Sequence, residues 1–335
     1  MPDPIRPILV TGANGFIGRT VVAELVERGE SVRALVRSEE KGRALEAMGA
    51  GCAIGDLTEA DSLEDAVRGC SAVIHLAGLV RARHRDELFA ANESGCRNLA
   101  RACLALEEPP RRFVSVSSLA AAGPARGRPK VESDEPAPVS DYGRSKLAGE
   151  RAIEQELSGR IPFAIVRPPA VYGPGDRDVL TFFEMADRGW LPKFSGPERQ
   201  YSFVHVEDLA RGVIEVALAD HLPSRVYFLA DAEVYAWSRL VSGFSMAVGR
   251  KVGSVPIPFP ALWLVATVQE LWARLRKKAP LLGWDKLKEM RATAWTCDAR
   301  RARDELGFRI DRTLEEGLAE TAAWYREQGW LKRRA

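Results

Sequence analysis

The chain has 335 residues, 46% hydrophobic and 28% charged, which is the composition of a globular protein with a sizeable core. Its formal net charge of +2 is too balanced for nucleic acid to be the main partner. The five cysteines form no Cys-x-x-Cys pair and no cluster with metal-ligand spacing, so no metal site is expected. Neither a signal-peptide pattern nor a run of about 18 apolar residues occurs, and scattered cysteines suit a reducing compartment. We therefore expect a cytoplasmic protein with a small-molecule substrate and no nucleic-acid partner.

Short apolar runs alternate with helical patterns through the first half of the chain. Such alternation predicts right-handed crossovers and a parallel sheet, and near-continuous apolar runs fit strands that are buried on both faces. We expect strands at Ile8–Val10, Ser31–Val36, Cys52–Ile54, Ala72–Leu76 and Arg112–Val116, with helices at Ile17–Arg28, Glu40–Met48, Ser62–Arg68 and Asp86–Leu106.

The pattern loosens after a further helix at Tyr142–Leu157 and a strand at Phe163–Val166. All eight tryptophans lie after position 189, and we expect most of them in a core and some beside an apolar ligand. The predicted fold class is α/β, a Rossmann doubly wound parallel sheet with a smaller mixed α/β C-terminal substrate domain. The expected NAD(P)-binding domain is 1–168 with parts of 200–230, and the substrate domain is mainly 169–335.

A glycine turn directly follows the first strand. Gly12 suits the tight turn, Gly15 permits close approach of a pyrophosphate to the backbone, and Gly18 lets helix and strand pack closely. The phosphates would lie at the N-terminus of the helix, where N–H groups are free. The turn therefore predicts a dinucleotide site, with cofactor contacts from Gly12, Asn14, Gly15, Phe16, Ile17 and Gly18.

The end of the second strand bears on the choice between NAD and NADP. An acidic residue about 20 positions after the glycines would bind the ribose 2′-hydroxyl, whereas an arginine accommodates a 2′-phosphate. Here the strand ends in Arg37, and Arg33 lies on the same strand face, which favours NADP. Glu39 and Glu40 are nearby and keep NAD open.

Two further strand ends lie at the same predicted edge of the sheet. The Asp56 carboxylate is placed to accept a hydrogen bond from the adenine amino group, unless it caps a helix instead. Gly78 allows close approach of the backbone to the cofactor, and His75 is expected to be structural. We expect cofactor contacts here from Asp56, Leu57, Leu76, Ala77 and Gly78.

The candidate catalytic residues are Ser118, Tyr142 and Lys146. Tyr142 and Lys146 are four residues apart, so they share one helical face. A cation beside a phenol lowers its pKa from about 10 and allows proton exchange while hydride moves at a neighbouring carbon. Ser118 follows the strand Arg112–Val116, where its hydroxyl is able to polarise a substrate carbonyl.

These motifs together resemble the extended short-chain dehydrogenase/reductase family, also described as the NAD-dependent epimerase/dehydratase family. The resemblance implies Tyr142 as the acid/base, Lys146 as the modulator of its pKa and a ribose ligand, and Ser118 as the carbonyl donor. It also implies that the segment from Pro168 through Val171 shapes the nicotinamide pocket. The matching stretches are Thr11–Gly18, Gly55–Leu57, His75–Gly78, Asn92–Asn98, Ser117–Ser118, Tyr142–Lys146, Arg167–Gly175, Phe203–Ala210 and Cys297–Phe308.

Two departures from the pattern of the sugar-nucleotide members concern the substrate. Pro169-Ala170 stands where those members usually carry asparagine, and Tyr201-Ser202 stands in place of an Arg-Asp pair. Loss of a phosphate-binding arginine argues against a diphosphate-linked sugar, although Arg199 is near enough in sequence to reach in. We therefore expect a hydrophobic, sterol-like or aromatic substrate.

The segment 259–279 has apolar residues at helical spacing and a basic end that includes Arg274, Arg276, Lys277 and Lys278. It is interpreted as a helix that packs on the substrate domain or covers its pocket. The alternative is peripheral membrane contact, with basic residues facing anionic lipid. This C-terminal part resembles the 3β-hydroxysteroid dehydrogenase-like branch, in which similar helices occur.

The leading hypothesis is an NADP-preferring oxidoreductase that acts on a ketone or secondary alcohol. The alternatives are a nucleotide-sugar epimerase or dehydratase with transient cofactor reduction, and a non-catalytic dinucleotide-binding regulator. By analogy with the family, a homodimer would pair through the helices around Asp86–Leu106 and Tyr142–Leu157.

Overall fold

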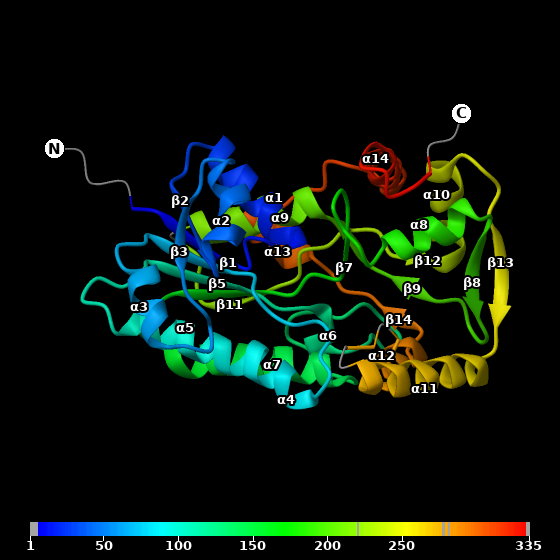
Figure 1. The fold of residues 1–335 in the computed structure, drawn as a ribbon, viewed down its shortest axis with the longest axis horizontal. Coiled ribbons are helices and arrows are strands. Elements are labelled where there is room, and N and C mark those ends of the chain that lie inside the picture. The colour runs from blue at the N-terminus through cyan, green and yellow to red at the C-terminus, as the bar shows by residue number, and fades with distance from the viewer. Residues whose placement is uncertain (1–5, 220, 277–278, 281, 333–335) are drawn as a thin grey trace.

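A seven-stranded parallel sheet forms the centre of the N-terminal part of the molecule (Figure 1). The computed structural model describes residues 6–219, 221–276, 279–280 and 282–332. The strand order is β11-β6-β5-β4-β1-β2-β3, in which the run 3-2-1-4-5-6 is that of a dinucleotide-binding Rossmann sheet. The strands are β1 (Ile8–Thr11), β2 (Val32–Val36), β3 (Gly51–Ile54), β4 (Ala72–His75), β5 (Arg112–Val116), β6 (Phe163–Val166) and β11 (Arg225–Tyr227). The expected α/β class is confirmed.

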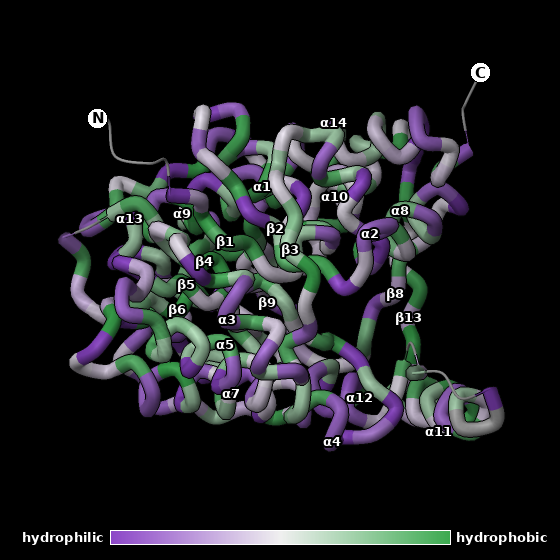
Figure 2. The backbone as a smooth tube through the Cα atoms, turned by 60° about the vertical axis from the view of Figure 1, so that its left-hand side comes forward, coloured by the Kyte–Doolittle hydropathy of each residue, from purple (hydrophilic) through white to green (hydrophobic). Residues whose placement is uncertain are grey.

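Helices cover both faces of this sheet and bury its alternating side chains. Ile8 and Val10 point into one apolar cluster, whereas Leu9 points into the other. Figure 2 shows the strands of the sheet as predominantly hydrophobic. The first cluster includes residues of α1 (Phe16–Glu27), α2 (Glu39–Glu46), α9 (Val206–Leu218) and α13 (Arg300–Leu306). The second includes α3 (Asp61–Val67), α5 (Gly95–Leu104) and α7 (Asp141–Leu157).

The helix expected at Asp86–Leu106 consists of three consecutive pieces. They are α4 (Arg85–Phe89), the π-helical turn η1 (Ala90–Ser94) and α5. The apolar periodicity did not predict the π turn. The turn inserts one residue between α4 and α5, and each of these helices keeps its own apolar periodicity. This turn carries Asn92, which is buried beside the predicted site.

The C-terminal part has its own aromatic core. Phe183, Phe244 and Tyr325 pack edge to face, with ring centroids 4.9 and 5.2 Å from Phe183. These three residues lie on the helices α8, α10 and α14. The same part of the molecule also contains three small sheets, β10-β7, β12-β9-β14 and β13-β8. The remaining elements are α6 (Leu119–Ala122), β7 (Ala170–Tyr172), α8 (Leu180–Asp187), β8 (Trp190–Phe194), β9 (Gln200–Tyr201), β10 (Phe203–His205), β12 (Tyr235–Ala236), α10 (Trp237–Val248), β13 (Gly253–Ile257), α11 (Phe259–Arg276), α12 (Trp284–Arg291), β14 (Ala294–Trp295) and α14 (Leu314–Glu327).

The chain crosses more than once between the two parts of the molecule. After β10 it returns to the Rossmann sheet through α9 and β11, and α13 later packs against α9. The boundary at residue 168 stays a prediction. Within the described residues, no helix combines the length and the apolarity that crossing a bilayer requires.

Candidate active site

The glycine turn between β1 and α1 has no space for side chains. Gly12 has a φ of +69°, and a Cβ there would lie 2.6 Å from the backbone nitrogen of Ala77. A Cβ on Gly18 would lie 2.1 Å from the carbonyl oxygen of Gly12, which explains the close packing of helix on strand. Gly15 is the N-cap of α1 and, in the described part of the chain, no side chain caps this helix. The first-turn N–H groups therefore suit a phosphate. Around this turn lie Asn14, Phe16 and Ile17.

His75 joins two strands beneath this turn. Its Nδ1 lies 2.7 Å from the hydroxyl of Thr11, and its Nε2 lies 3.3 Å from the Cys96 sulfur. Burial lowers the His75 pKa to about 3, so the ring is neutral. The hydroxyl of Thr11 also accepts a hydrogen bond from Ala77 N at 3.3 Å. These contacts support the structural role expected for His75, and they hold the Leu76–Gly78 segment against the glycine turn.

Asn92 fixes the position of Gly78. Its Oδ1 accepts a hydrogen bond from Leu79 N at 2.8 Å, while its Nδ2 donates to Leu79 O and to Ser145 Oγ, both at 2.9 Å. A Cβ on Gly78 would lie 2.7 Å from Asn92 Oδ1 and 3.3 Å from Lys146 Nζ. The sequence interpretation gave Asn92 no role, although a lone asparagine in an apolar helical pattern was a visible signal.

Arg37 and Asp56 lie near each other beyond the carboxyl ends of β2 and β3, at the same edge of the sheet as the glycine turn. Hydrogen bonds from the backbone and the hydroxyl of Thr58 lower the Asp56 pKa, and the Arg37 charge lowers it further. One carboxylate oxygen is thus used in a local turn, and Asp56 does not cap the following helix, because the N-cap of α3 is Ala60. The adenine contact of Asp56 stays a prediction. Leu57 is half-buried beside it. Arg37 is exposed and open to a ligand.

Arg33 does not join Arg37 as the sequence suggested. Its guanidinium donates to the carbonyl oxygens of Ala66 at 3.0 Å and Arg68 at 2.7 Å. The orphan carbonyls at the end of α3 lie within its reach and hold it there. A 2′-phosphate would therefore depend on Arg37 alone of these two arginines.

Ser118 and Tyr142 lie together at the carboxyl edge of the sheet. Ser118 caps α6 by accepting a hydrogen bond from Ala120 N at 3.1 Å, and its hydroxyl lies close enough to the Tyr142 phenol to lower the pKa of that group. Burial raises the Tyr142 pKa to about 12, against the lowering expected from Lys146. The Lys146 ammonium donates to Val116 O at 2.9 Å and lies beside Gly78. Its role as a modulator of the tyrosine stays a prediction.

Acidic groups from the C-terminal part reach the start of α7. The Asp285 carboxylate accepts hydrogen bonds from Asp141 N at 2.8 and 3.0 Å and from Tyr142 N at 3.2 Å. After burial, the charges of Glu289 and Asp178 contribute to the raised Tyr142 pKa. These long-range neighbours had no signal in the local sequence.

A buried ion pair lies one helical turn beyond Lys146. Glu150 accepts hydrogen bonds from Arg167 Nε at 2.9 Å, from Arg167 Nη2 at 2.5 Å and from the Ser117 hydroxyl at 2.5 Å. All three side chains are less than 8% exposed. The pair connects the ends of β5 and β6 to α7, and so it fixes the segments that carry Ser118, Tyr142 and Pro168. The sequence interpretation did not include it.

The predicted nicotinamide segment continues from this ion pair. Pro168 is buried, and its carbonyl accepts a hydrogen bond from Leu119 N at 2.8 Å. Val171 is half-buried on β7, opposite Val204 of β10. Pro168 thus lies beside the helix that Ser118 caps. Its contribution to a nicotinamide pocket stays a prediction.

Arg199, the remaining candidate to bind the diphosphate of a nucleotide sugar, is buried, and its guanidinium contacts other parts of the protein. It donates to Ala292 O at 2.6 Å, and its guanidinium lies 4.9 Å from the ring centre of Phe194. Ser202, at the position of the missing pair, accepts a hydrogen bond from Cys297 N at 3.1 Å. Both side chains therefore hold the C-terminal segment in place.

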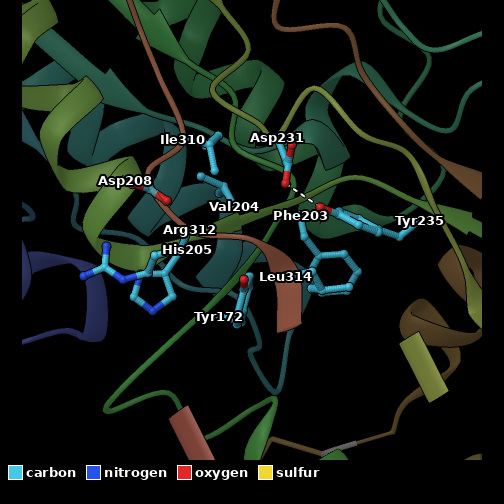
Figure 3. Close-up of a pocket in the computed structure, with 10 residues that line it drawn as sticks. All are labelled: Tyr172, Phe203, Val204, His205, Asp208, Asp231, Tyr235, Ile310, Arg312 and Leu314. Carbon is cyan, nitrogen blue, oxygen red and sulfur yellow. Dashed lines mark hydrogen bonds between the residues drawn. The ribbon is translucent and has the colours of Figure 1, made fainter. Parts of the chain in front are cut away.

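A second polar cluster lies between β7, β10 and the segment before α14 (Figure 3). Tyr235 donates to Asp231 at 2.5 Å, and the Tyr172 and His205 rings pack edge to face at 5.3 Å. The space in which a water-sized molecule fits is about 0 Å³, against roughly 300–1,000 Å³ for ligand sites. The lining residues are all distinct from Ser118, Tyr142 and Lys146, and we assign no ligand to this cluster.

Comparison with known protein families identifies the N-terminal two thirds of the chain. The family described as "NAD dependent epimerase/dehydratase family" matches residues 8–230. Among solved structures, MoeE5 in complex with UDP-glucose and NAD is similar, with a TM-score of 0.75 and 26% identity over 96% of this chain and 99% of that one.

Two curated relatives are similar over nearly the whole chain. Ceramide reductase of Caulobacter vibrioides is 30% identical over 97% of this chain and 96% of its own length. The 4-hydroxy-2-methyl-3-oxo-4-farnesyl-3,4-dihydroquinoline-1-oxide ketoreductase of Stigmatella aurantiaca is also 30% identical, over 92% of this chain and 93% of its own length.

Proposed function

Because the chain belongs to the NAD dependent epimerase/dehydratase family, whose members bind a nicotinamide dinucleotide, we propose that it is an NADP-preferring oxidoreductase. Its reaction interconverts a ketone and a secondary alcohol on a hydrophobic substrate. The observation that carries this proposal is the proximity of the Ser118 hydroxyl to the Tyr142 phenol at the carboxyl edge of the sheet, on the side of the glycine turn. In an open α/β sheet, ligands bind beyond this edge.

Each residue of the site has a defined task in ketone reduction. The nicotinamide supplies the hydride when the cofactor is bound. Tyr142 donates a proton to the carbonyl oxygen, and its raised pKa keeps the phenol protonated at neutral pH. Ser118 polarises the same oxygen through its hydroxyl. Lys146 presents its charge beside Gly78, where we place the nicotinamide ribose.

The preference for NADP rests on Arg37. Its side chain is exposed at the end of β2, and its charge acts on Asp56 at the neighbouring strand end. A guanidinium in this position is suited to bind a 2′-phosphate with two parallel hydrogen bonds. For the pyrophosphate and the nicotinamide half of the cofactor, the proposed contacts are the N–H groups of the glycine turn, Gly78 and Pro168.

Two observations support a hydrophobic substrate. Arg199 is engaged by Ala292 O, which leaves it unsuited to bind a sugar diphosphate. The ceramide reductase and the farnesyl-dihydroquinoline ketoreductase are both named for reduction of lipid-like molecules. The resemblance of the C-terminal part to the 3β-hydroxysteroid dehydrogenase-like branch points in the same direction.

A nucleotide-sugar epimerase or dehydratase is the second candidate, because the MoeE5 structure holds UDP-glucose and NAD. Such an enzyme would reduce and reoxidise its cofactor within one turnover. A non-catalytic regulator would bind the cofactor without chemistry, and the presence of Ser118, Tyr142 and Lys146 argues against that reading.

The test is net cofactor consumption by the purified full chain. NADPH oxidation is followed with long-chain ketones, sterol ketones, aromatic ketones and UDP-sugars, and NADH is run in parallel. We expect NADPH oxidation with the apolar ketones alone. Conversion of a UDP-sugar without net change in cofactor would overturn the proposal in favour of the epimerase.

We also propose that the chain forms a homodimer through the outward faces of α5 and α7. The measurement is the molar mass of the purified protein in solution. A monomeric mass at micromolar concentration would contradict this pairing.

A further inference from the structure

Helix α11 turns three polar side chains toward the protein and most of its large apolar side chains toward solvent. Gln269 and Glu270 accept hydrogen bonds from the backbone nitrogens of Leu282, at 2.8 Å, and Trp284, at 3.2 Å. Thr267 accepts a hydrogen bond from the Trp284 indole at 3.2 Å. The large apolar side chains of the opposite face are 46–60% exposed: Trp263, Leu264, Val265, Val268, Leu271 and Trp272.

This outer face, which we call the α11 face, lies at the edge of the molecule (Figure 1). Figure 2 shows the same helix from another side, projecting past β8 and β13. Its inner side chains Leu262 and Ala266 pack on Leu287 of α12 and on the ends of β8 and β13. The helix is thus anchored on one side, and a contiguous apolar surface of this kind marks an interaction site.

The arrangement of side chains on the α11 face suits the plane of a lipid bilayer. At about 3.6 residues per turn, Leu264, Val268 and Leu271 form a central row, with Trp263 on one side and Trp272 on the other. Tryptophan favours the boundary between lipid headgroups and acyl chains, so two flanking indoles set a shallow depth of insertion.

Charge adds a second, independent argument. The sequence from 259 to 278 contains four basic residues and one acidic residue, Glu270, whose carboxylate is turned toward Trp284. The Arg276 guanidinium lies 3.9 Å from the ring centre of Trp272, at the border of the apolar row. A guanidinium beside an apolar stripe, as Arg276 is here, attracts anionic lipid headgroups.

We propose that the α11 face docks this protein on the surface of an anionic membrane. The helix lies in the interface without spanning the bilayer, in agreement with the lack of a spanning helix in the described residues. A second copy of the chain would cover the apolar row equally well, but the net positive charge of residues 259–278 would then be present on both sides of the contact. The proposal stands apart from the identity of the substrate.

Docking there would bring the membrane to the side of the molecule that carries the catalytic tyrosine. Helix α12 packs on α11 through Leu287 and Met290, and its Asp285 carboxylate binds the backbone of Tyr142. Figures 1 and 2 show α11, α12 and α4 along the same edge.

The test is flotation of the full chain with vesicles of phosphatidylglycerol and phosphatidylcholine. Val268→Glu places a charge in the middle of the apolar row, and Leu264→Glu repeats the change at a second position. Met246→Glu on α10 is the matched control, because Met246 is 61% exposed and lies outside the α11 face. We expect both α11 variants to bind at least about tenfold more weakly than wild type, since each loses apolar burial and adds repulsion.

The control variant should float like wild type, and vesicles of phosphatidylcholine alone should bind less protein. Failure of the wild-type chain to float, or equal flotation of the α11 variants, would overturn the proposal. A dimeric wild-type protein that Val268→Glu converts to a monomer would also overturn it, because a second copy would then cover this face. NADPH oxidation with a water-soluble ketone should be unchanged in Val268→Glu, so membrane docking and the proposed reaction are tested separately.

Discussion

Removal of the Glu150 carboxylate should destabilise the whole Rossmann part, because it leaves a buried arginine without its counter-ion. Glu150 and Arg167 are 5% and 4% exposed, and the carboxylate accepts three hydrogen bonds from Arg167 and Ser117. Breaking one partner of a buried pair costs about 3–5 kcal/mol, and the lost acceptor for Ser117 adds about 1 kcal/mol. We therefore expect Glu150→Ala to lower the free energy of unfolding by about 5 kcal/mol.

The assay is urea unfolding at neutral pH, followed by fluorescence of the tryptophans. With an m value of about 3 kcal/mol per M, the midpoint should fall by more than about 1 M. The control is Glu24→Ala, which removes a partly exposed pair with Arg28 and should cost less than about 1 kcal/mol.

A double variant separates charge from packing. In Glu150→Met/Arg167→Met no buried charge is left unpaired, so it should lose less stability than Glu150→Ala. A Glu150→Ala protein within about 1 kcal/mol of wild type would refute the argument from the buried charge. A double variant less stable than Glu150→Ala would show that hydrogen-bond geometry, rather than charge balance, dominates.

Three further predictions concern the cofactor, the chemistry and pH. Tyr142→Phe should lower turnover by at least about 100-fold, because the proton donor is lost, while NADPH binding followed by fluorescence stays near wild type; retained activity would remove Tyr142 from the catalytic role. Arg37→Ala should raise the Kd for NADPH about tenfold or more and leave the Kd for NADH within about twofold, since only the 2′-phosphate contact is lost; equal changes for both cofactors would contradict the assignment. Burial lowers the His75 pKa to about 3, so between about pH 6.5 and pH 3 the unfolded chain holds a proton on His75 that the folded chain does not. Stability should therefore fall as pH drops through this window, and urea midpoints should decrease less steeply in His75→Asn than in His84→Asn, a control at an exposed histidine; equal slopes would remove His75 as a cause.

The sequence by itself was sufficient for the local features of the site. The three glycines of the first turn are required by contacts within that turn or just across it, and the spacing of Tyr142 and Lys146 is that of one helical face. The alternation of apolar runs with helices predicted the parallel sheet, since period and chain direction follow from short windows. Arg37 was likewise read from its distance to the glycine turn.

The sequence did not predict partners that meet only when the sheet is assembled. Asn92 binds Leu79 and Ser145, the Glu150 pair joins three elements, and Asp285 comes from the far end of the chain to the start of α7. Arg33 donates hydrogen bonds to carbonyl oxygens at the end of α3. The sequence of β2 does not specify which helix packs beside the strand, so it did not predict this contact.

Residues 259–276 show the division most clearly. Their sequence contains apolar residues almost all around the helix, so it left open whether the helix packs inside or meets a membrane. The tertiary structure decided which apolar residues face outward, because hydrogen bonds from Leu282 and Trp284 hold the polar side of α11 against the protein. A pattern along one helix gives the periodicity, but the side that is buried depends on the segment that packs against it.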